Sequence, residues 1–238
     1  MTTWIRQIYD VARHISFSSP SLFLESIKIL WLCHRIRKHT VVDIARLKML
    51  YKLTKEIDIA SVPGDIVECG VFKGGSAVLI TRAAHRSHFD RHIWLFDSFE
   101  GLPRPTKEDG SEALERFHEG WNRGDMSEVK KLFETFSVLD SRVHFVKGYF
   151  HDTFQSISMS QIALLHIDAD WYHSVKLCLE RFYEFVQPGG FIALDDYGRW
   201  EGCRKATDEF IEKHNLNVKL VPVDGVEHYF QKPRDPAA

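Results

Sequence analysis

The chain has 238 residues, enough for one large α/β domain, and 44% of them are hydrophobic, so it can bury a substantial core. Its 31 basic and 33 acidic residues leave a net charge of −2, which gives no indication of a nucleic-acid or anionic-membrane surface. No apolar run reaches the roughly 18 residues that cross a bilayer. The four cysteines are far apart, which indicates neither a zinc knuckle nor a disulfide framework, so we expect a cytoplasmic protein.

The first sixty residues predict a helical extension. Apolar residues recur at spacings of three and four in segments 8–15, 22–32 and 41–57. Pro63 and Gly64 then end the helical section. We therefore divide the chain into a helical extension or lid over 1–60 and a main domain over 61–238. Such helices either cover a ligand cleft or make a dimer contact, and the sequence leaves both open.

A glycine-rich turn opens the main domain. Residues 65–70 predict a short apolar strand, Gly70, Gly74 and Gly75 make the turn after it, and a helix begins near Ser76. Glycines let a backbone approach a ligand closely, and a helix start presents free N–H groups. The spacing GxxxGG differs from the GxGxxG of dinucleotide-binding domains, which argues against NAD. A tight turn that binds no ligand is the alternative.

Asp97 ends the next predicted strand, 92–96. An acid at the end of the second strand of a nucleotide-binding fold accepts hydrogen bonds from ribose hydroxyls, which predicts that role for Asp97. A helix N-cap is the alternative. Residues 104–142 are polar and predict a mobile loop followed by a helix over 127–136. A third strand is expected to end at Gly148.

Two apolar runs end in pairs of carboxylates. Asp168 and Asp170 follow the run 163–167, and Asp195 and Asp196 follow the run 189–194. In a parallel sheet these acids would meet at the carboxyl edge, where ligands bind. Four carboxylates repel one another unless a cation neutralises them or some stay protonated, and we predict a divalent cation.

Each acid also has a structural alternative. Asp195 or Asp196 could cap the next turn, and Asp168 could pair with a lysine. Asp170, two residues beyond Asp168, is expected to point to the same face and serve as a general base, but it could instead be a fourth ligand or a helix N-cap. His166 is predicted to be a core histidine.

The remaining segments complete an α/β sheet. An amphipathic helix is predicted over 174–186, a second helix within 198–215, and a terminal hairpin over 216–232 with its turn at Asp224 and Gly225. The order is therefore βα units followed by a hairpin, in one sheet.

Five motifs in this order resemble the macrocin O-methyltransferase (TylF-like) family over roughly residues 40–232. They are VECGVFKGGSA, LFDSFEGLP, HIDADWYHS, PGGFIALDDYG and GCRKATDEF. The resemblance implies a Rossmann-like class I methyltransferase sheet with helices on both faces. It also implies S-adenosylmethionine and Mg²⁺ as cofactors, methylation of a hydroxyl of a sugar, typically in a glycosylated natural product, and a homo-oligomer.

The resemblance also implies residue roles. The family's metal ligands match Asp168, Asp195 and Asp196, and its proposed general base matches Asp170. The residues implied to bind the methyl donor are Glu68, Gly70, Gly74, Ser76, Asp97 and Ser98.

Two other functions remain open at this point. A metal-dependent glycosyltransferase holds its metal with an Asp-x-Asp motif, which Asp168-Ala169-Asp170 matches by itself. Asp195, Asp196 and the glycine-rich turn with its paired acid Asp97 argue against it. A binding module without catalysis would be supported by a missing metal site, but all the acids are present. The acceptor molecule is not readable from the sequence.

Overall fold

The computed structural model describes residues 20–234, with side chains from residue 24 onward. Seven strands form one sheet in the order β3-β2-β1-β4-β5-β7-β6. The first five strands run parallel, and β7 is antiparallel to β5 and β6. Their bounds are β1 Asp65–Cys69, β2 Ile93–Asp97, β3 Val143–Lys147, β4 Ile162–Ile167, β5 Val186–Leu194, β6 Val221–Pro222 and β7 His228–Gln231.

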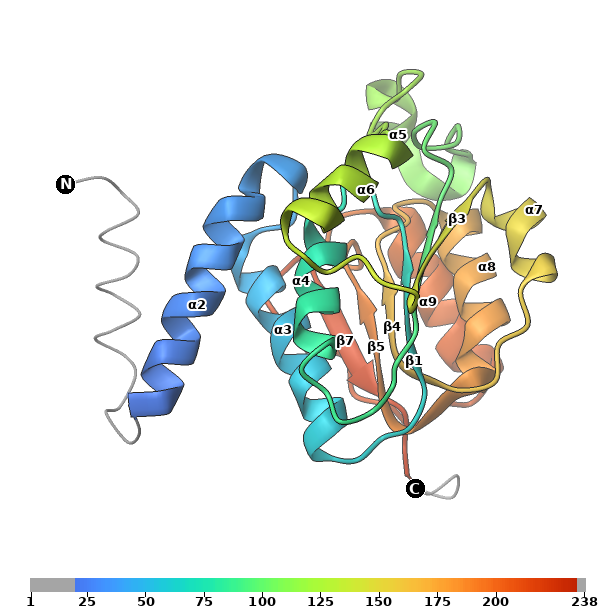
Figure 1. Ribbon diagram of the computed structural model, residues 1–238. Coiled ribbons are helices and arrows are strands. Elements are labelled where there is room, and N and C mark those ends of the chain that lie inside the picture. The colour runs from blue at the N-terminus through green and yellow to red at the C-terminus, as the bar shows by residue number, and fades with distance from the viewer. Residues whose placement is uncertain (1–19, 235–238) are drawn as a thin grey trace.

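Helices cover both faces of this sheet (Figure 1). One face carries α2, α3 and α4, and the other carries α8 and α9. The helix bounds are α2 Pro20–Ile36, α3 Ile44–Ile59, α4 Gly75–Ala84, α5 Gly110–Arg116, α6 Met126–Thr135, α7 Phe150–Thr153, α8 Tyr172–Phe182 and α9 Glu201–Lys213. Short 3₁₀ turns are η1 Arg37–His39, η2 Lys107–Asp109, η3 Phe154–Ser156 and η4 Tyr183–Phe185.

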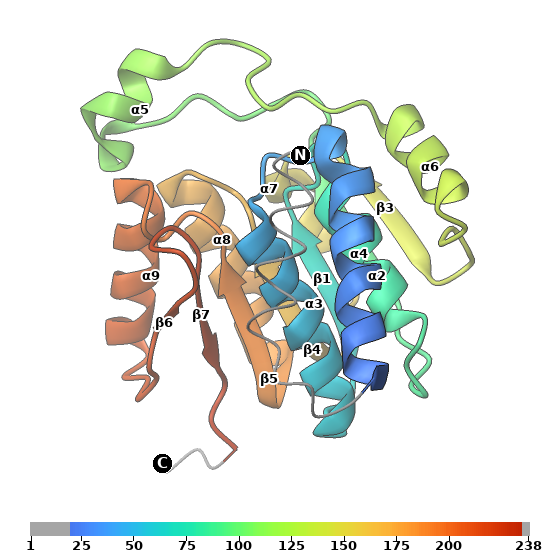
Figure 2. The same cartoon turned by 90° about the vertical axis from the view of Figure 1, so that its left-hand side faces the viewer.

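Most elements lie where the sequence predicts them. The α/β sheet, the helix after the polar loop and the antiparallel terminal pair are confirmed. The structure adds α5 inside the segment predicted to be a loop, and Figure 2 shows it beyond one edge of the sheet, above α9. The predicted helix over 8–15 lies outside the described residues.

The described part of the N-terminal extension shares the core of the sheet. Apolar side chains of α3, among them Leu47, Leu50 and Leu53, are buried in the same cluster as Ile66 of β1. Asp43 caps α3 by accepting a hydrogen bond from the Ala45 N–H at 3.0 Å. The extension is therefore a layer of the fold, and the boundary at residue 60 stays a prediction.

The parallel strands place their following residues at one edge. Ladder hydrogen bonds continue one residue past β1, β4 and β5, from Gly70 N to Phe96 O, Asp168 N to Cys69 O and Asp195 N to Ile167 O. The side chains that follow these strands are therefore held in register with one another. Within residues 20–234 no helix is long and apolar enough to cross a membrane.

Candidate active site

A cavity of about 250 Å³ lies at the carboxyl edge of the sheet. Loops after β1, β2 and β4 form most of its wall, and Thr40 and Val41, just before α3, add to it. The sequence-predicted residues that line it are Gly70, Ser76, Asp97, Ser98, Asp168 and Asp170.

Gly70 allows two strand ends to approach closely. Its φ is +96°, and a Cβ placed there would lie 1.7 Å from the carbonyl oxygen of Asp168. No side chain fits at that distance, so the glycine-rich turn after β1 (residues 70–75, called the glycine loop below) and the loop that begins with Asp168 are in direct backbone contact. Gly74 has a φ of +83° just before α4 and is not in the cavity wall, so it shapes the turn that presents Ser76.

Asp97 fastens the glycine loop to the end of β2. Its Oδ2 accepts hydrogen bonds from the N–H groups of Val71 and Phe72 at 2.7 and 2.9 Å, and its Oδ1 accepts from Phe99 N–H at 2.6 Å. Burial raises the pKa of Asp97, and the three N–H groups oppose that rise. These donors belong to loops, so Asp97 caps no helix. Oδ2 already accepts two hydrogen bonds, whereas Oδ1 accepts one and keeps a lone pair for a ribose hydroxyl, and that role stays a prediction.

Ser98 and Glu68 differ in their access to the cavity. Ser98 lines it, while its hydroxyl donates to Gly101 O at 2.9 Å. Glu68 is fully buried, is not in the cavity wall, and pairs through Oε1 with His166 Nδ1 at 3.0 Å. The strand alternation turns the Glu68 side chain into the face covered by α3, so the structure does not bring it to the predicted donor site.

Three of the four predicted acids converge. Ligand oxygens of Asp168, Asp195 and Asp196 lie within 4.8 Å of one another. Burial, followed by the neighbouring carboxylates, raises the pKa of Asp168 and of Asp196 well above the usual range. The cluster therefore has the geometry and the excess negative charge that suit a hard divalent cation.

Arg46 of α3 is a cationic partner that the sequence analysis missed. Its Nη1 lies 2.5 Å from Asp195 Oδ2, and its Nε lies 3.1 Å from Asp224 Oδ2. Asp195 thus pairs with an arginine and not with the next turn. Nothing in the helical pattern around Arg46 distinguishes it from a solvent-facing residue, because the partner is 149 positions away.

Asp170 lies beside the cluster in a different backbone conformation. Its φ is +53°, so the expectation that strand geometry aligns it with Asp168 is wrong: β4 already ends at Ile167. The Trp200 indole N–H donates to Asp170 Oδ1 at 3.0 Å. Burial and then the charge of Asp195 raise the pKa of Asp170 to about 7, which suits a group that exchanges protons near neutrality.

Asp170 is also not the N-cap of α8. That position is Trp171, and the first helical N–H, of Tyr172, donates to Asp109 Oδ1 at 2.6 Å. Asp109 is buried at η2 and was not singled out by the sequence analysis. A remote carboxylate therefore caps α8 and leaves Asp170 in the cavity wall.

Three tryptophans support this corner. The rings of Trp121, Trp171 and Trp200 lie at tilted or edge-on angles with centroids 5.1 to 6.0 Å apart. The Trp171 indole N–H donates to Pro103 O at 2.8 Å. The aromatic group fixes the loop that carries Asp170.

Comparison with known proteins decides the family. The profile of the macrocin-O-methyltransferase (TylF) family matches residues 35–232. The chain belongs to this family. It is an S-adenosylmethionine-dependent O-methyltransferase, as the motifs predict.

Curated relatives of this methyltransferase carry the names of bacterial O-methyltransferases. It is 34% identical over 194 residues to the 8-demethyl-8-(2,3-dimethoxy-alpha-L-rhamnosyl)-tetracenomycin-C 4'-O-methyltransferase of Streptomyces olivaceus, covering 79% of this chain and 73% of that protein. It is 28% identical over 233 residues to the mycinamicin III 3''-O-methyltransferase of Micromonospora griseorubida, covering 94% and 91%.

Solved structures share its fold. The O-methyltransferase NovP superposes with a TM-score of 0.76 at 32% identity, covering 82% of this chain and 83% of that one. A calicheamicin methyltransferase gives a TM-score of 0.64 at 18% identity, covering 96% and 91%, which bears on the fold alone. The class I Rossmann-like sheet is thus confirmed, and the glycosyltransferase alternative finds no support among these proteins.

Proposed function

We propose that this enzyme transfers the methyl group of S-adenosylmethionine to a hydroxyl of a sugar in a glycosylated natural product, with Mg²⁺ at the acid cluster. The observation that carries the proposal is the shared cavity: the glycine loop and Asp168 and Asp170 line one space of about 250 Å³. Donor, acceptor and base would therefore lie within reach of one another.

The donor is assigned to the side formed by the glycine loop. Gly70 and Ser76 line the cavity next to Asp97 and Ser98. The amide-bound carboxylate of Asp97 would accept hydrogen bonds from the ribose, and the backbone at Gly70 allows close approach of the amino-acid part. The acids nearby favour the positive charge of the sulfonium.

Mg²⁺ is assigned to Asp168, Asp195 and Asp196. Carboxylate oxygens within 4.8 Å of one another are the hard ligands that this ion prefers, and their raised pKa values mark the cost of holding them together without a cation. When bound, the ion would orient the acceptor hydroxyl and lower its pKa.

Asp170 is assigned the role of general base. It lines the cavity, and the Trp200 indole holds one of its oxygens at 3.0 Å, which leaves the other for the acceptor hydroxyl. Its carboxylate would take the hydroxyl proton as the oxygen attacks the methyl carbon and the carbon–sulfur bond breaks, which leaves S-adenosylhomocysteine. Alignment of oxygen, carbon and sulfur would supply much of the rate.

The acceptor class rests on the relatives. The names of three curated relatives at 28–34% identity describe O-methyltransferases of tetracenomycin, novobiocin and mycinamicin compounds, and one of these names includes a rhamnosyl group. His173, which is exposed, lines the cavity and so lies where an acceptor could meet it. Thr40 and Val41 bring the N-terminal extension into the same wall, consistent with its predicted role as a lid.

A labelled-methyl assay tests the proposal. The full chain is incubated with methyl-labelled S-adenosylmethionine, Mg²⁺ and a panel of glycosides, with the matching aglycones as controls. Label is expected in glycosides and not in aglycones, and chelator should abolish it. Label in aglycones alone would overturn the sugar assignment, and full activity in chelator would overturn the metal assignment.

Homo-oligomerisation and a cytoplasmic location stay predictions. On α2 the side chains of Leu24 and Trp31 are 55% and 47% exposed, and they lie seven residues apart on one side of the helix. Light scattering of the full chain tests the first prediction, with Trp31→Glu as the variant expected to shift any oligomer toward monomer.

A further inference from the structure

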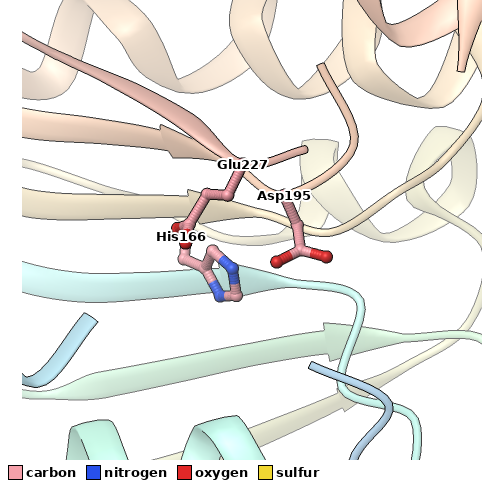
Figure 3. Close-up of side chains that lie close together, drawn as sticks. All are labelled: His166, Asp195 and Glu227. Carbon is pink, nitrogen blue, oxygen red and sulfur yellow. The ribbon is translucent and has the colours of Figure 1, made fainter. Parts of the chain in front are cut away.

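A second group of metal-binding side chains lies in the buried sheet. His166 of β4, Asp195 after β5 and Glu227 before β7 place one ligand atom each within 4.8 Å of one another. Figure 3 shows the three side chains gathered over adjacent strands. Asp195 belongs to this group and also to the acid cluster at the cavity.

The strand register explains why they meet. His166 pairs with Ala193, and Ala193 pairs with Tyr229 across the sheet. Asp195 is two residues beyond Ala193, and Glu227 is two residues before Tyr229, so all three side chains point to the face that α3 covers. Glu68, which pairs with His166 on the other side, points to that face as well.

The polar atoms of this group lack partners. His166 and Glu227 are fully buried, and Asp195 is 3% exposed. Among the described residues, His166 Nε2, Asp195 Oδ1 and both carboxylate oxygens of Glu227 are buried without a hydrogen bond. Buried polar atoms are seldom left without partners, so four of them in one place point to a site that takes a ligand.

Glu68 contacts one ring nitrogen of His166 and leaves the other ring nitrogen open. Its Oε1 lies 3.0 Å from His166 Nδ1. In the tautomer whose Nδ1–H donates to Glu68, Nε2 carries the free lone pair on the other side of the ring. A carboxylate behind the imidazole is the usual arrangement for a histidine that ligates a metal.

We propose that His166, Asp195 and Glu227 form a second cation site that takes Zn²⁺. An imidazole nitrogen with two carboxylates suits a first-row transition-metal ion, whereas Mg²⁺ takes oxygen ligands. Asp195 can serve both sites because Oδ1 accepts no hydrogen bond, and Oδ2, which accepts from Arg46, keeps a second lone pair for the acid cluster. The proposal does not depend on the methyl acceptor.

The alternative to a bound metal ion is protonation of His166 itself. An imidazolium at His166 would donate from both ring nitrogens and offset the charge of Glu68, Asp195 and Glu227. That arrangement needs no metal, so measured metal binding separates the two.

The experiment titrates the chelator-treated full chain with Zn²⁺ in excess Mg²⁺, by calorimetry. The wild type is expected to bind one equivalent of Zn²⁺. His166→Gln and Glu227→Gln should each lower the Zn²⁺ affinity at least tenfold, and Glu68→Gln should lower it about 10–100-fold. The control Asp168→Asn, which alters only the cavity cluster, should keep that equivalent. The proposal is overturned if the wild type binds no Zn²⁺, or if His166→Gln and Glu227→Gln bind it as tightly as the wild type does.

A second measurement needs no variant. X-ray absorption at the zinc edge of the loaded wild type should report one imidazole and oxygen ligands at about 2.0–2.2 Å. Two or more imidazoles would assign the ion to surface histidines and overturn the proposal. Both readouts concern metal binding, so their failure leaves the methyltransferase assignment intact, and a missing methyl transfer leaves the zinc site intact.

Discussion

Two kinds of aspartate stand at the carboxyl edge of this sheet, and their surroundings differ. Asp97 accepts three backbone N–H bonds at 2.6 to 2.9 Å, so the chain itself satisfies its charge. Asp168, Asp195 and Asp196 face one another, and the one ion pair that any of them makes within residues 20–234 is that of Asp195 with Arg46. The hydrogen bonds of Asp97 hold a loop together, whereas the clustered carboxylates repel one another, and this is where we propose that Mg²⁺ offsets their charge.

The largest effect is expected from a substitution in the cluster of Asp168, Asp195 and Asp196. Asp196→Asn removes a ligand oxygen and one negative charge, so methyl transfer should fall below detection while donor binding stays within threefold of wild type. Turnover with labelled donor and calorimetry with S-adenosylhomocysteine measure the two quantities. Asp152→Asn, at an exposed position, is the matched control. Wild-type turnover in Asp196→Asn would refute the metal assignment.

Asp170→Asn tests the base next to the ligands. The amide keeps the shape and the hydrogen-bond acceptor for Trp200 but cannot take a proton, so kcat should fall by roughly 10²–10⁴. Mg²⁺ affinity, read by calorimetry, should change little. A large loss of Mg²⁺ affinity with a small change in kcat would instead make Asp170 a fourth ligand.

Asp97→Ala should produce a smaller and mixed effect. Three N–H groups lose their acceptor, and each one that stays buried and unpaired lowers the free energy of unfolding by about 1–3 kcal/mol. The affinity for the methyl donor should fall about tenfold. Denaturant unfolding and calorimetry measure them separately. Asp97→Asn, which keeps one acceptor oxygen, should recover part of both. A variant that loses stability with unchanged donor affinity would make Asp97 purely structural.

The smallest expected effect concerns pH. The pKa of Asp170 is raised to about 7, and those of Asp168 and Asp196 are raised too, so these three groups bind more protons in the folded than in the unfolded chain above pH ~4. Without cation, their contribution to stability should therefore be fully present below that pH and be lost as the pH rises through 7.

Thermal melts in chelator and in Mg²⁺ measure this trend. Each kcal/mol lost lowers Tm by about 2–4 °C for a chain of this size. Mg²⁺ should raise Tm more at pH 8 than at pH 5, and Asp170→Asn should flatten the slope in chelator. A Tm in chelator that rises between pH 5 and 7 would contradict the account.

The sequence predicted the sheet and most of the cavity because both depend on local signals. Apolar runs, glycines and the acids at strand ends are short-range patterns, and the parallel topology brings them together. It did not predict Arg46, Asp109 or Glu227, because their partners lie far away in the chain. The family motif assigned Glu68 to the methyl-donor site, whereas the strand alternation turns its side chain to the sheet face that α3 covers, where it contacts His166.

The contact at Gly70 has a consequence for redesign. A Cβ at Gly70 would lie 1.7 Å from the Asp168 carbonyl oxygen, so the backbone contact between these two loops leaves no room for an added atom. Thr40 and Val41, by contrast, line the cavity from the N-terminal extension. Acceptor preference is therefore best changed by substitutions in that extension, because the backbone contact at Gly70 must keep its shape for every substrate.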